Sequence, residues 1–369
     1  MKIAFDHKVF TNQTYGGISR YYTILADELL KQHMDVRIFA GFHRNHYLSD
    51  LPESVVTGRR INRYPPKSTR VFDLMNHAIS QTQMRAWQPD IIHETYYSAL
   101  PTLNTTSVRV TSVYDMIHEL FADQFSPRDK TTQWKKGTLE RVDHIISISH
   151  STKCDLVELF GIDEKKITVV HLGVDLTAFQ NNPLVLSGFN NPFVLYVGDR
   201  GGYKNFSVLL KAFAASPRLK NELDIVAFGG SSFNAAEQKL IKQLRYKEGQ
   251  VRQVGGGDDF LASIYHQAEA FVYPSLHEGF GLPPLEAMAA GCPVISSNAG
   301  SMPEVIGTAG AYFDPNDIED MKDAIEKVVF SNGLQKDLIT LGFKNVEDFS
   351  WEKCAGETID VYRKITGKS

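Results

Sequence analysis

Short apolar runs alternate with longer amphipathic stretches along most of the chain. In the first half, the apolar runs predict strands at 3–6, 36–40, 90–93, 109–114, 144–149 and 167–171. Between these runs, apolar positions three or four residues apart predict helices at 17–32, 72–87, 127–141 and 151–160. Ser151 suits the N-cap of the last helix, and Gly161 suits its end.

The second half repeats the same alternation. It predicts strands at 193–197, 224–228, 251–254, 270–273 and 293–296, with helices between them and after Asn316. Because apolar strands alternating with helices are typical of parallel sheets covered on both faces, each half predicts a doubly wound α/β domain. The length of 369 residues agrees with two domains of about 150 residues each.

Segment 174–192 interrupts this alternation with turn-forming residues, including Asn-Asn-Pro at both 181–183 and 190–192. We expect the linker between the domains there. The chain then divides into an N-terminal domain at 1–175 and a C-terminal domain at 176–349. Since ligands of open α/β sheets bind at the carboxyl ends of strands, we expect the functional site in a cleft where the two domains face each other.

The segment EGFGLPPLE at 278–286 carries the strongest candidate chemistry, because it sets two carboxylates around a glycine-rich turn. Pro284 suits the first position of a helix, which would put Glu286 in the first turn. Backbone N–H groups at a helix start favour a phosphate, while carboxylates accept pairs of hydroxyl donors. The segment therefore suits a sugar–diphosphate–nucleoside. In the alternative interpretation, Glu286 caps the helix and Glu278 is solvated.

A second glycine loop, GDRGGYKN at 198–205, carries the cations Arg200 and Lys204. A departing diphosphate needs its developing charge neutralised, and Arg and Lys can supply this. Two surface cations are the alternative. The chain has no Asp-x-Asp, no His-Glu-x-x-His and no cysteine cluster. A metal-bridged diphosphate is therefore disfavoured, and we expect neither a metal nor another cofactor.

Two weaker candidates lie in the first half. Gly16 and Gly17 precede a predicted helix, where their backbone N–H groups could approach a ligand, although a plain tight turn explains them equally. Asp115 and His118 follow the strand at 109–114 and could orient an acceptor hydroxyl or take up its proton. A structural role for His118 stays open.

Charge and cysteine content narrow the partners and the compartment. The net charge of −4 gives no general attraction to nucleic acid. Basic residues do gather, without an acid among them, at Arg59, Arg60, Arg63, Lys67 and Arg70, which is a candidate surface for an anionic acceptor or a membrane, or a solvated loop. Three scattered cysteines, no signal peptide and no apolar run near the roughly 20 residues of a membrane span favour a cytoplasmic protein. Contact with the inner face of the plasma membrane stays open.

Together these residues resemble a known family. Over nearly its whole length the chain is similar to retaining, nucleotide-sugar-dependent glycosyltransferases of family four. The specific signal is the Glu-x7-Glu stretch with its Gly-Phe-Gly-Leu-Pro centre, and Phe349-Ser350-Trp351 resembles the start of the last helix of that family. The resemblance implies the GT-B architecture, in which two doubly wound Rossmann-like parallel-sheet domains face each other across a cleft. It also implies that 350–369 forms a C-terminal helix crossing back to the N-terminal domain.

The resemblance further implies roles for individual residues. Glu278 would contact the donor hexose, Glu286 would bind the ribose, and Lys204 would bind the diphosphate. Other donor contacts are implied or expected at Gly198, Gly255, Gly279, Phe280, Gly281 and Leu282, and contacts to phosphate or acceptor at Gly16 and Gly17. Many relatives carry a basic residue where Tyr203 stands, so Arg200 could substitute for it. Many also carry His-Asp where this chain has Tyr114-Asp115, so the role of that histidine could pass to His118 or be absent.

The resulting hypothesis is transfer of a hexose, mannose or glucose, from a nucleoside-diphosphate sugar to a glycan or lipid-linked glycan. Such a reaction would serve bacterial polysaccharide biosynthesis and would retain the anomeric configuration. Two alternatives stay open, a nucleotide-sugar epimerase of the same architecture and a non-catalytic sugar-binding module. A nicotinamide-dependent enzyme is disfavoured because Gly-x-Gly-x-x-Gly is missing.

Overall fold

The computed structural model of the chain describes residues 1–101, 106–180, 188–189 and 191–368. It divides into two compact units, one made of Met1–Gly173 with Trp351–Ser369 and the other of Val174–Ser350. The sequence placed these boundaries after residues 175 and 349. The turn expected at 181–183 lies outside the described residues, and helix α7 (Leu176–Gln180) occupies the start of the expected linker.

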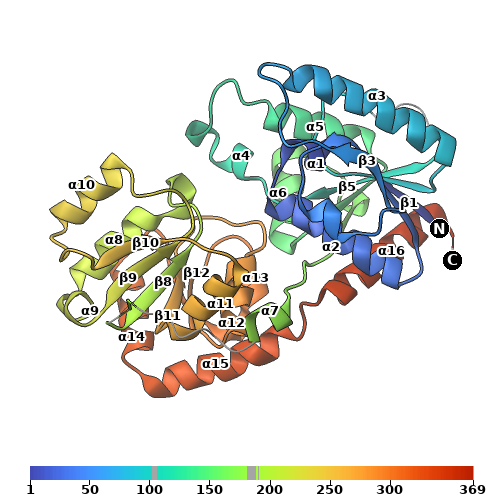
Figure 1. Cartoon of the computed structure of the whole chain (residues 1–369). Coiled ribbons are helices and arrows are strands. Elements are labelled where there is room, and N and C mark those ends of the chain that lie inside the picture. Colours follow the sequence, from blue (N-terminus) through green and yellow to red (C-terminus); the bar gives the residue numbers. More distant parts are fainter. Residues whose placement is uncertain (102–105, 181–187, 190, 369) are drawn as a thin grey trace. The chain divides into compact units, whose positions relative to one another are not determined.

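The first unit is built on a parallel sheet of seven strands in the order β3-β2-β1-β4-β5-β6-β7. Its strands are β1 (Lys2–Phe5), β2 (Asp35–His43), β3 (Val56–Arg60), β4 (Ile91–Glu94), β5 (Val108–Val113), β6 (His144–Ser147) and β7 (Ile167–Val169). Its helices are α1 (Lys8–Asn12), α2 (Gly17–Lys31), α3 (Thr69–Trp87), α4 (Ile117–Leu120), α5 (Thr131–Arg141), α6 (His150–Phe160) and α16 (Trp351–Thr366). Figure 1 shows α3 and α5 on one side of this sheet and α2 and α16 on the other.

The terminal helix α16 is anchored on the sheet through a buried histidine. The Tyr362 hydroxyl lies 2.6 Å from His93 Nδ1, and Ser112 Oγ lies 3.0 Å from His93 Nε2. Burial lowers the pKa of His93 to about 3, so the ring is neutral near pH 7. A neutral ring can be held between two hydroxyl groups without burying a charge, and this holds α16 against β4 and β5.

The second unit contains a parallel sheet of six strands in the order β10-β9-β8-β11-β12-β13. Its strands are β8 (Phe193–Val197), β9 (Asp224–Phe228), β10 (Val251–Val254), β11 (Ala270–Tyr273), β12 (Val294–Ser297) and β13 (Gly310–Phe313). Its helices, besides α7, are α8 (Phe206–Ala215), α9 (Pro217–Glu222), α10 (Ala235–Gln243), α11 (Asp258–Gln267), α12 (Leu282–Ala289), α13 (Met302–Ile306), α14 (Ile318–Val329) and α15 (Asn332–Val346). A continuous apolar core joins the sheet to α8 and α14. The fold class expected from the sequence, doubly wound and parallel, is confirmed in both units.

One local expectation was wrong, and the alternative of a solvated loop at 59–70 holds only in part. The segment with Arg59 and Arg60 is not a loop throughout, because it contains the edge strand β3. Ser151 does not cap α6, since the helix begins at His150 and Ser149 Oγ accepts the N–H of Thr152 at 3.0 Å. An N-cap residue needs an extended backbone just before the helix, and Ser149 is the residue that has it.

Both sheets reverse their strand order at one point, between β1 and β4 in the first unit and between β8 and β11 in the second. Ligands of doubly wound sheets bind beyond the carboxyl ends of the strands at such a switch point. In the second unit, the loops leaving β8 and β11 are the two that carry Lys204 and Glu278. The topology thus brings the two strongest candidate loops of the sequence to one place.

A close approach of two strands gives a test of the edge of the first sheet. A Cβ atom on Gly58 would lie 2.4 Å from the carbonyl oxygen of Gly41, where the register between β2 and β3 shifts. We expect Gly58→Ala to lower the free energy of unfolding by about 1–3 kcal/mol, because the added methyl group overpacks this site. The thermal midpoint of unfolding should fall accordingly. Gly137→Ala is the control, because nothing lies within 4 Å of its Cβ and it lies in helix α5. The free energy of unfolding of that variant should rise by about 0.5–1 kcal/mol, because alanine favours a helix more than glycine does. Equal midpoints for both variants would contradict the packing described.

Candidate functional site

Lys204 and Glu278 form an ion pair at the switch point of the second unit. Lys204 Nζ donates to Glu278 Oε1 at 2.7 Å. The side chains are 19% and 9% exposed, so each charge is largely removed from water and depends on the other. The ammonium also lies 5.2 Å and 5.8 Å from the ring centroids of Tyr203 and Tyr273. The pair therefore sets a fixed cation and a fixed carboxylate side by side, where the loops after β8 and β11 meet.

Asn205 ties the surrounding loops together. Its side-chain amide donates to the carbonyl of Pro274 at 3.1 Å and to that of Pro315 at 2.8 Å. The Leu276 N–H also donates to the Tyr203 carbonyl, at 2.8 Å. Asn205 has a φ of 61°, a left-handed conformation that Asn tolerates better than most residues. The loops after β8, β11 and β13 are thus held by one side chain, for which the sequence had given no role.

The turn before α13, at Gly300 and Ser301, packs against the backbone of Glu278 and hydrogen-bonds to it. Ser301 Oγ donates to the carbonyl oxygens of Glu278 and Phe280, at 3.0 Å and 2.7 Å. Gly300 has a φ of +59°, and a Cβ there would lie 2.9 Å from both N and O of Glu278. Only glycine meets both conditions without strain. This turn was not recognised from the sequence, because its contacts join segments more than twenty residues apart.

Helix α12 begins two residues earlier than expected, at Leu282 and not at Pro284, with Gly281 as its N-cap. Gly281 has a φ of +106°, and a Cβ there would lie 2.5 Å from the terminal methyl of Met302. Because the helix starts earlier, Glu286 lies beyond the first turn, and the expectation that it lies within it was wrong. Proline has no N–H, so the backbone donors at this end of the helix are those of Gly281 and Leu282.

Glu286 has a partner that disfavours the helix-capping interpretation. The Tyr265 hydroxyl donates to Glu286 Oε2 at 3.4 Å and to the Pro283 carbonyl at 3.2 Å. Burial raises the pKa of Tyr265 well above its usual value, so the hydroxyl remains a donor. Glu286 is only partly buried, and its carboxylate can accept further hydroxyl groups.

Two further glycines predicted at the site follow strands of the second sheet. Gly198 comes directly after β8, with a φ of +128° and open space at its Cβ position, and Gly255 comes directly after β10.

Arg200 is already engaged within the second unit. Its Nε donates to Glu237 at 2.9 Å, its Nη1 to the Gly229 carbonyl at 3.0 Å, and its Nη2 to the Ser231 carbonyl. Its side chain is only 5% exposed, and the guanidinium lies 4.9 Å from the ring centroid of Phe233. The structure gives Arg200 a role in holding the turn after β9. A contact between Arg200 and a diphosphate stays a prediction that would require these partners to be exchanged.

The candidates of the first unit lie at the carboxyl edge of its sheet. Gly16 is the N-cap of α2, and a Cβ on Gly17 would meet nothing within 4 Å. Asp115 Oδ1 accepts the Ile117 N–H at 3.0 Å, which fixes the start of α4. His118 stacks on Phe125 with ring centroids 4.0 Å apart. The local bonds support structural roles for Asp115 and His118, and their catalytic roles stay predictions.

A small cavity of about 180 Å³ in the first unit was not foreseen from the sequence. Lys8, Asp73, Tyr64 and Trp134 are among its lining residues. Lys8 Nζ donates to both oxygens of Asp73, at 2.8 Å and 2.9 Å, and lies 5.8 Å from the ring centroid of Trp134. Its position just after β1 and its mixture of charge and aromatic surface suit a polar ligand. The segment DHK at 6–8 was the available signal, but its partner Asp73 is far away in the sequence.

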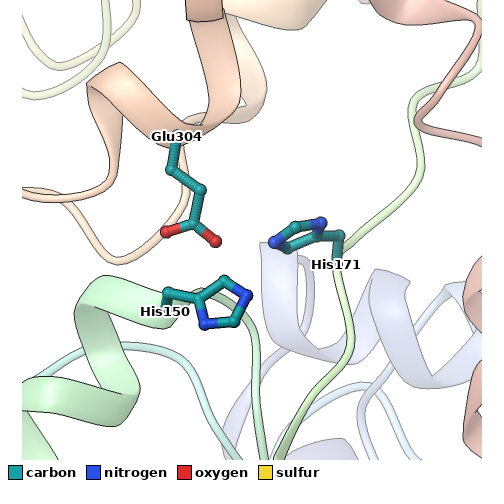
Figure 2. Close-up of side chains that lie close together, drawn as sticks. All are labelled: His150, His171 and Glu304. Atoms are coloured by element: carbon teal, nitrogen blue, oxygen red, sulfur yellow. The ribbon is translucent and has the colours of Figure 1, made fainter.

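His150 and His171 form a second pair of titratable side chains in the first unit. Their ring centroids lie 6.1 Å apart in a perpendicular arrangement, with His150 at the start of α6 and His171 after β7 (Figure 2). With Lys153, Glu357 and Lys364 they line a groove of about 540 Å³ beside α16. Glu304, drawn in the same figure, belongs to α13 of the second unit. The sequence analysis assigned no function to these histidines.

The two sheets and the loops at their switch points define the class of protein. A family model described as "Glycosyltransferase Family 4" matches residues 15–178, and one described as "Glycosyl transferases group 1" matches residues 186–344. The chain is 30% identical over 270 residues to the O-antigen chain mannosyltransferase B of Escherichia coli, over 69% of this chain and 70% of that protein. The chain therefore belongs to the glycosyltransferases of family four, and it is an enzyme of this class. Several other matching mannosyltransferases are longer, and the chain spans 57% of one and 37% of another.

Solved structures support the GT-B fold. The sucrose-phosphate synthase tll1590 of Thermosynechococcus elongatus aligns with a TM-score of 0.78 at 21% identity, over 100% of both chains. The Anabaena protein Alr3699/HepE, solved in complex with UDP-glucose, aligns with a TM-score of 0.75 at 17% identity, over 98% of this chain and 100% of that chain. At these identities the likeness shows the fold alone.

The role of Asn205 can be tested without a ligand. Asn205→Ala removes both side-chain bonds that join the loops after β8, β11 and β13, so these loops should open more often. We expect faster amide hydrogen exchange at 198–206 and 274–278, with exchange in the first unit unchanged. Asn221→Ala, at an exposed position of α9, should leave exchange in both loops as in the parent chain. Unchanged exchange in Asn205→Ala would show that the loops are held in another way.

Proposed function

We propose that this glycosyltransferase transfers a hexose from a nucleoside-diphosphate sugar to a hydroxyl group of a growing glycan, with retention of configuration. The observation that carries the proposal is the Lys204–Glu278 ion pair at the switch point of the second sheet. A cation held there by a carboxylate is placed to take up the charge of a departing diphosphate. The names of the relatives, with O-antigen mannosyltransferases among them, support polysaccharide biosynthesis and a mannosyl donor.

In this proposal each residue of the site has a defined role. Lys204 faces the diphosphate and stabilises the negative charge that develops as the donor bond breaks. Glu278 accepts hydroxyl groups of the hexose and keeps Lys204 in position before the donor arrives. Glu286 accepts the two ribose hydroxyls, while the N–H groups of Gly281 and Leu282 lie at the helix start where phosphate oxygens are favoured. UDP-glucose bound to the Anabaena relative supports a nucleotide-sugar ligand for this fold.

Same-face attack is the favoured route to retention. The bond between the anomeric carbon and the diphosphate oxygen breaks, and the acceptor oxygen forms its bond to that carbon on the same side. The acceptor proton passes to the departing phosphate oxygen, so no base on the chain is required. A double displacement would instead need a nucleophilic carboxylate on the far side of the sugar, and the sequence offers no distinct candidate for it.

Two further features of the reaction are proposals. The acceptor is a glycan or a lipid-linked glycan, as the O-antigen relatives suggest. The reaction takes place on the cytoplasmic side, which the free thiols of Cys154, Cys292 and Cys354 support. No helix of the described residues is long and apolar enough to cross a membrane.

Two substitutions test the site. We expect Lys204→Ala and Glu278→Ala each to lower turnover by about 10²–10³, as removal of one preorganised charge commonly does. Lys239→Ala, at an exposed position of α10, is the matched control and should keep the parent rate. Turnover is measured with labelled GDP-mannose and UDP-glucose and a glycan acceptor, with circular dichroism confirming the fold of each variant. Near-parent transfer by both site variants would refute the assignment.

The same assay separates the alternatives. An epimerase would isomerise the labelled donor in the absence of acceptor, and a binding module would bind the donor without turnover on any acceptor. The transferase should do little without acceptor. With acceptor, the nuclear magnetic resonance spectrum of the product should show the anomeric configuration of the donor.

Metal removal gives a separate prediction. If Lys204 supplies the neutralising charge, treatment with a chelator should leave the transfer rate unchanged, and added Mg²⁺ or Mn²⁺ should not raise it. The measurement is the initial rate of transfer in chelator, with and without excess metal. Loss of activity in chelator that returns with metal would assign the charge neutralisation to a metal ion.

A further inference from the structure

Helix α3 carries an apolar stripe on its outer face. Val71 and Leu74 are 58% and 59% exposed, and Met75 is 42% exposed. Ala78 is exposed as well. Residues three and four positions apart lie on the same face of a helix, so these four side chains form one continuous strip along its first half. In Figure 1, α3 runs along the outside of the first unit.

The inner face of the same helix is polar at its centre and apolar toward its ends, where Phe72 stacks on Tyr64 and Met84 lies in the core. Asn76, Ser80 and Gln81 are buried against the unit. The Asn76 side chain accepts the N–H of Phe42 at 2.7 Å and donates to the Phe42 carbonyl at 3.0 Å, which satisfies β2 beside its register shift at Gly41. A surface helix of a globular domain normally turns its apolar residues inward, as α3 does with Phe72 and Met84. Val71, Leu74 and Met75 are exposed in addition to these inward contacts, and an exposed apolar patch of this kind marks a contact surface.

A run of cations leads directly into this stripe. It consists of exposed residues at the end of β3, in the following connection and in the first turn of α3, namely Arg59, Arg60, Arg63, Lys67 and Arg70. The chain has no acidic residue from 56 to 72. Among the described residues, none of these cations forms an ion pair, although Arg60 lies 2.9 Å from the His46 ring. The next acid, Asp73, is already bound by Lys8.

We propose that this face, the strip at 71–78 with the cations at 59–70, docks on the surface of an anionic lipid bilayer. The apolar side chains would enter the boundary between headgroups and acyl chains, while the cations meet anionic headgroups. Charge complementarity selects this occupant. A second copy of the chain placed symmetrically on the same face would bring five cations against five. A nucleic acid would use the cations but would leave the apolar strip exposed to water.

The proposal is independent of glycosyl transfer, because docking needs neither donor nor acceptor. The test is flotation of the purified chain with vesicles of phosphatidylcholine, with and without phosphatidylglycerol. We expect binding to the anionic vesicles only, weakening as salt is added. Arg63→Gln/Lys67→Gln/Arg70→Gln should weaken it by roughly fivefold per cation, about 10² in total. Val71→Ser/Leu74→Ser/Met75→Ser should weaken it by about tenfold or more.

A matched variant and a second measurement keep the test decisive. Val157→Ser/Leu159→Ser changes two exposed apolar residues of α6, 37% and 44% exposed, and should bind vesicles as the parent chain does. Failure of the parent chain to float with anionic vesicles, or an equal loss in the α6 variant, would overturn the proposal. Sedimentation velocity without lipid measures whether the chain dimerises. A dimer that becomes a monomer in Val71→Ser/Leu74→Ser/Met75→Ser would also overturn the proposal, because the strip would then be a contact between two copies of the chain. Thermal midpoints of all variants confirm that each is folded.

Discussion

The ion pair between Lys204 and Glu278 is the interaction on which the site depends. Two largely buried charges are favourable only while both remain charged and in contact, so each fixes the other. The surrounding backbone is built to keep them there. Asn205 joins three loops, and the turn with Gly300 and Ser301 holds Glu278 from behind. The cation is therefore in place before any ligand arrives, which is the condition under which electrostatic stabilisation contributes most to a reaction.

The sheets of the two units are both parallel and each reverses its strand order at one point, but the side chains at the two switch points differ. In the second unit, glycine loops and a helix start accompany the ion pair, which suits a phosphate and sugar hydroxyls. In the first unit, the corresponding edge has Lys8 with Asp73 beside Trp134, and the glycine pair at the start of α2. The groups that suit a phosphate and sugar hydroxyls are thus concentrated in the second unit. The first unit carries helix α3, where Asn76 accepts the Phe42 N–H of β2 while Val71, Leu74 and Met75 remain exposed.

Much of the fold could be predicted from the sequence, because buried parallel strands are apolar throughout and stand out as runs. Strands β8 to β11 have the bounds that the pattern predicted. The edge strands β3 and β13 were missed, because their exposed or partly exposed residues do not form such a run. The helix start at Leu282 was misplaced, because the prolines that suggested a first position occupy the second and third. Within the site, Glu278 and Lys204 were predicted together, whereas Asn205 and Ser301 act through contacts distant in sequence.

The most direct test of the central claim is a crystal structure of the chain with a bound nucleoside diphosphate. The account predicts the terminal phosphate within hydrogen-bonding distance of Lys204 Nζ and the N–H groups of Gly281 and Leu282, with the ribose hydroxyls on Glu286. A diphosphate bound elsewhere, or a phosphate at this site that makes no contact with Lys204, would contradict it.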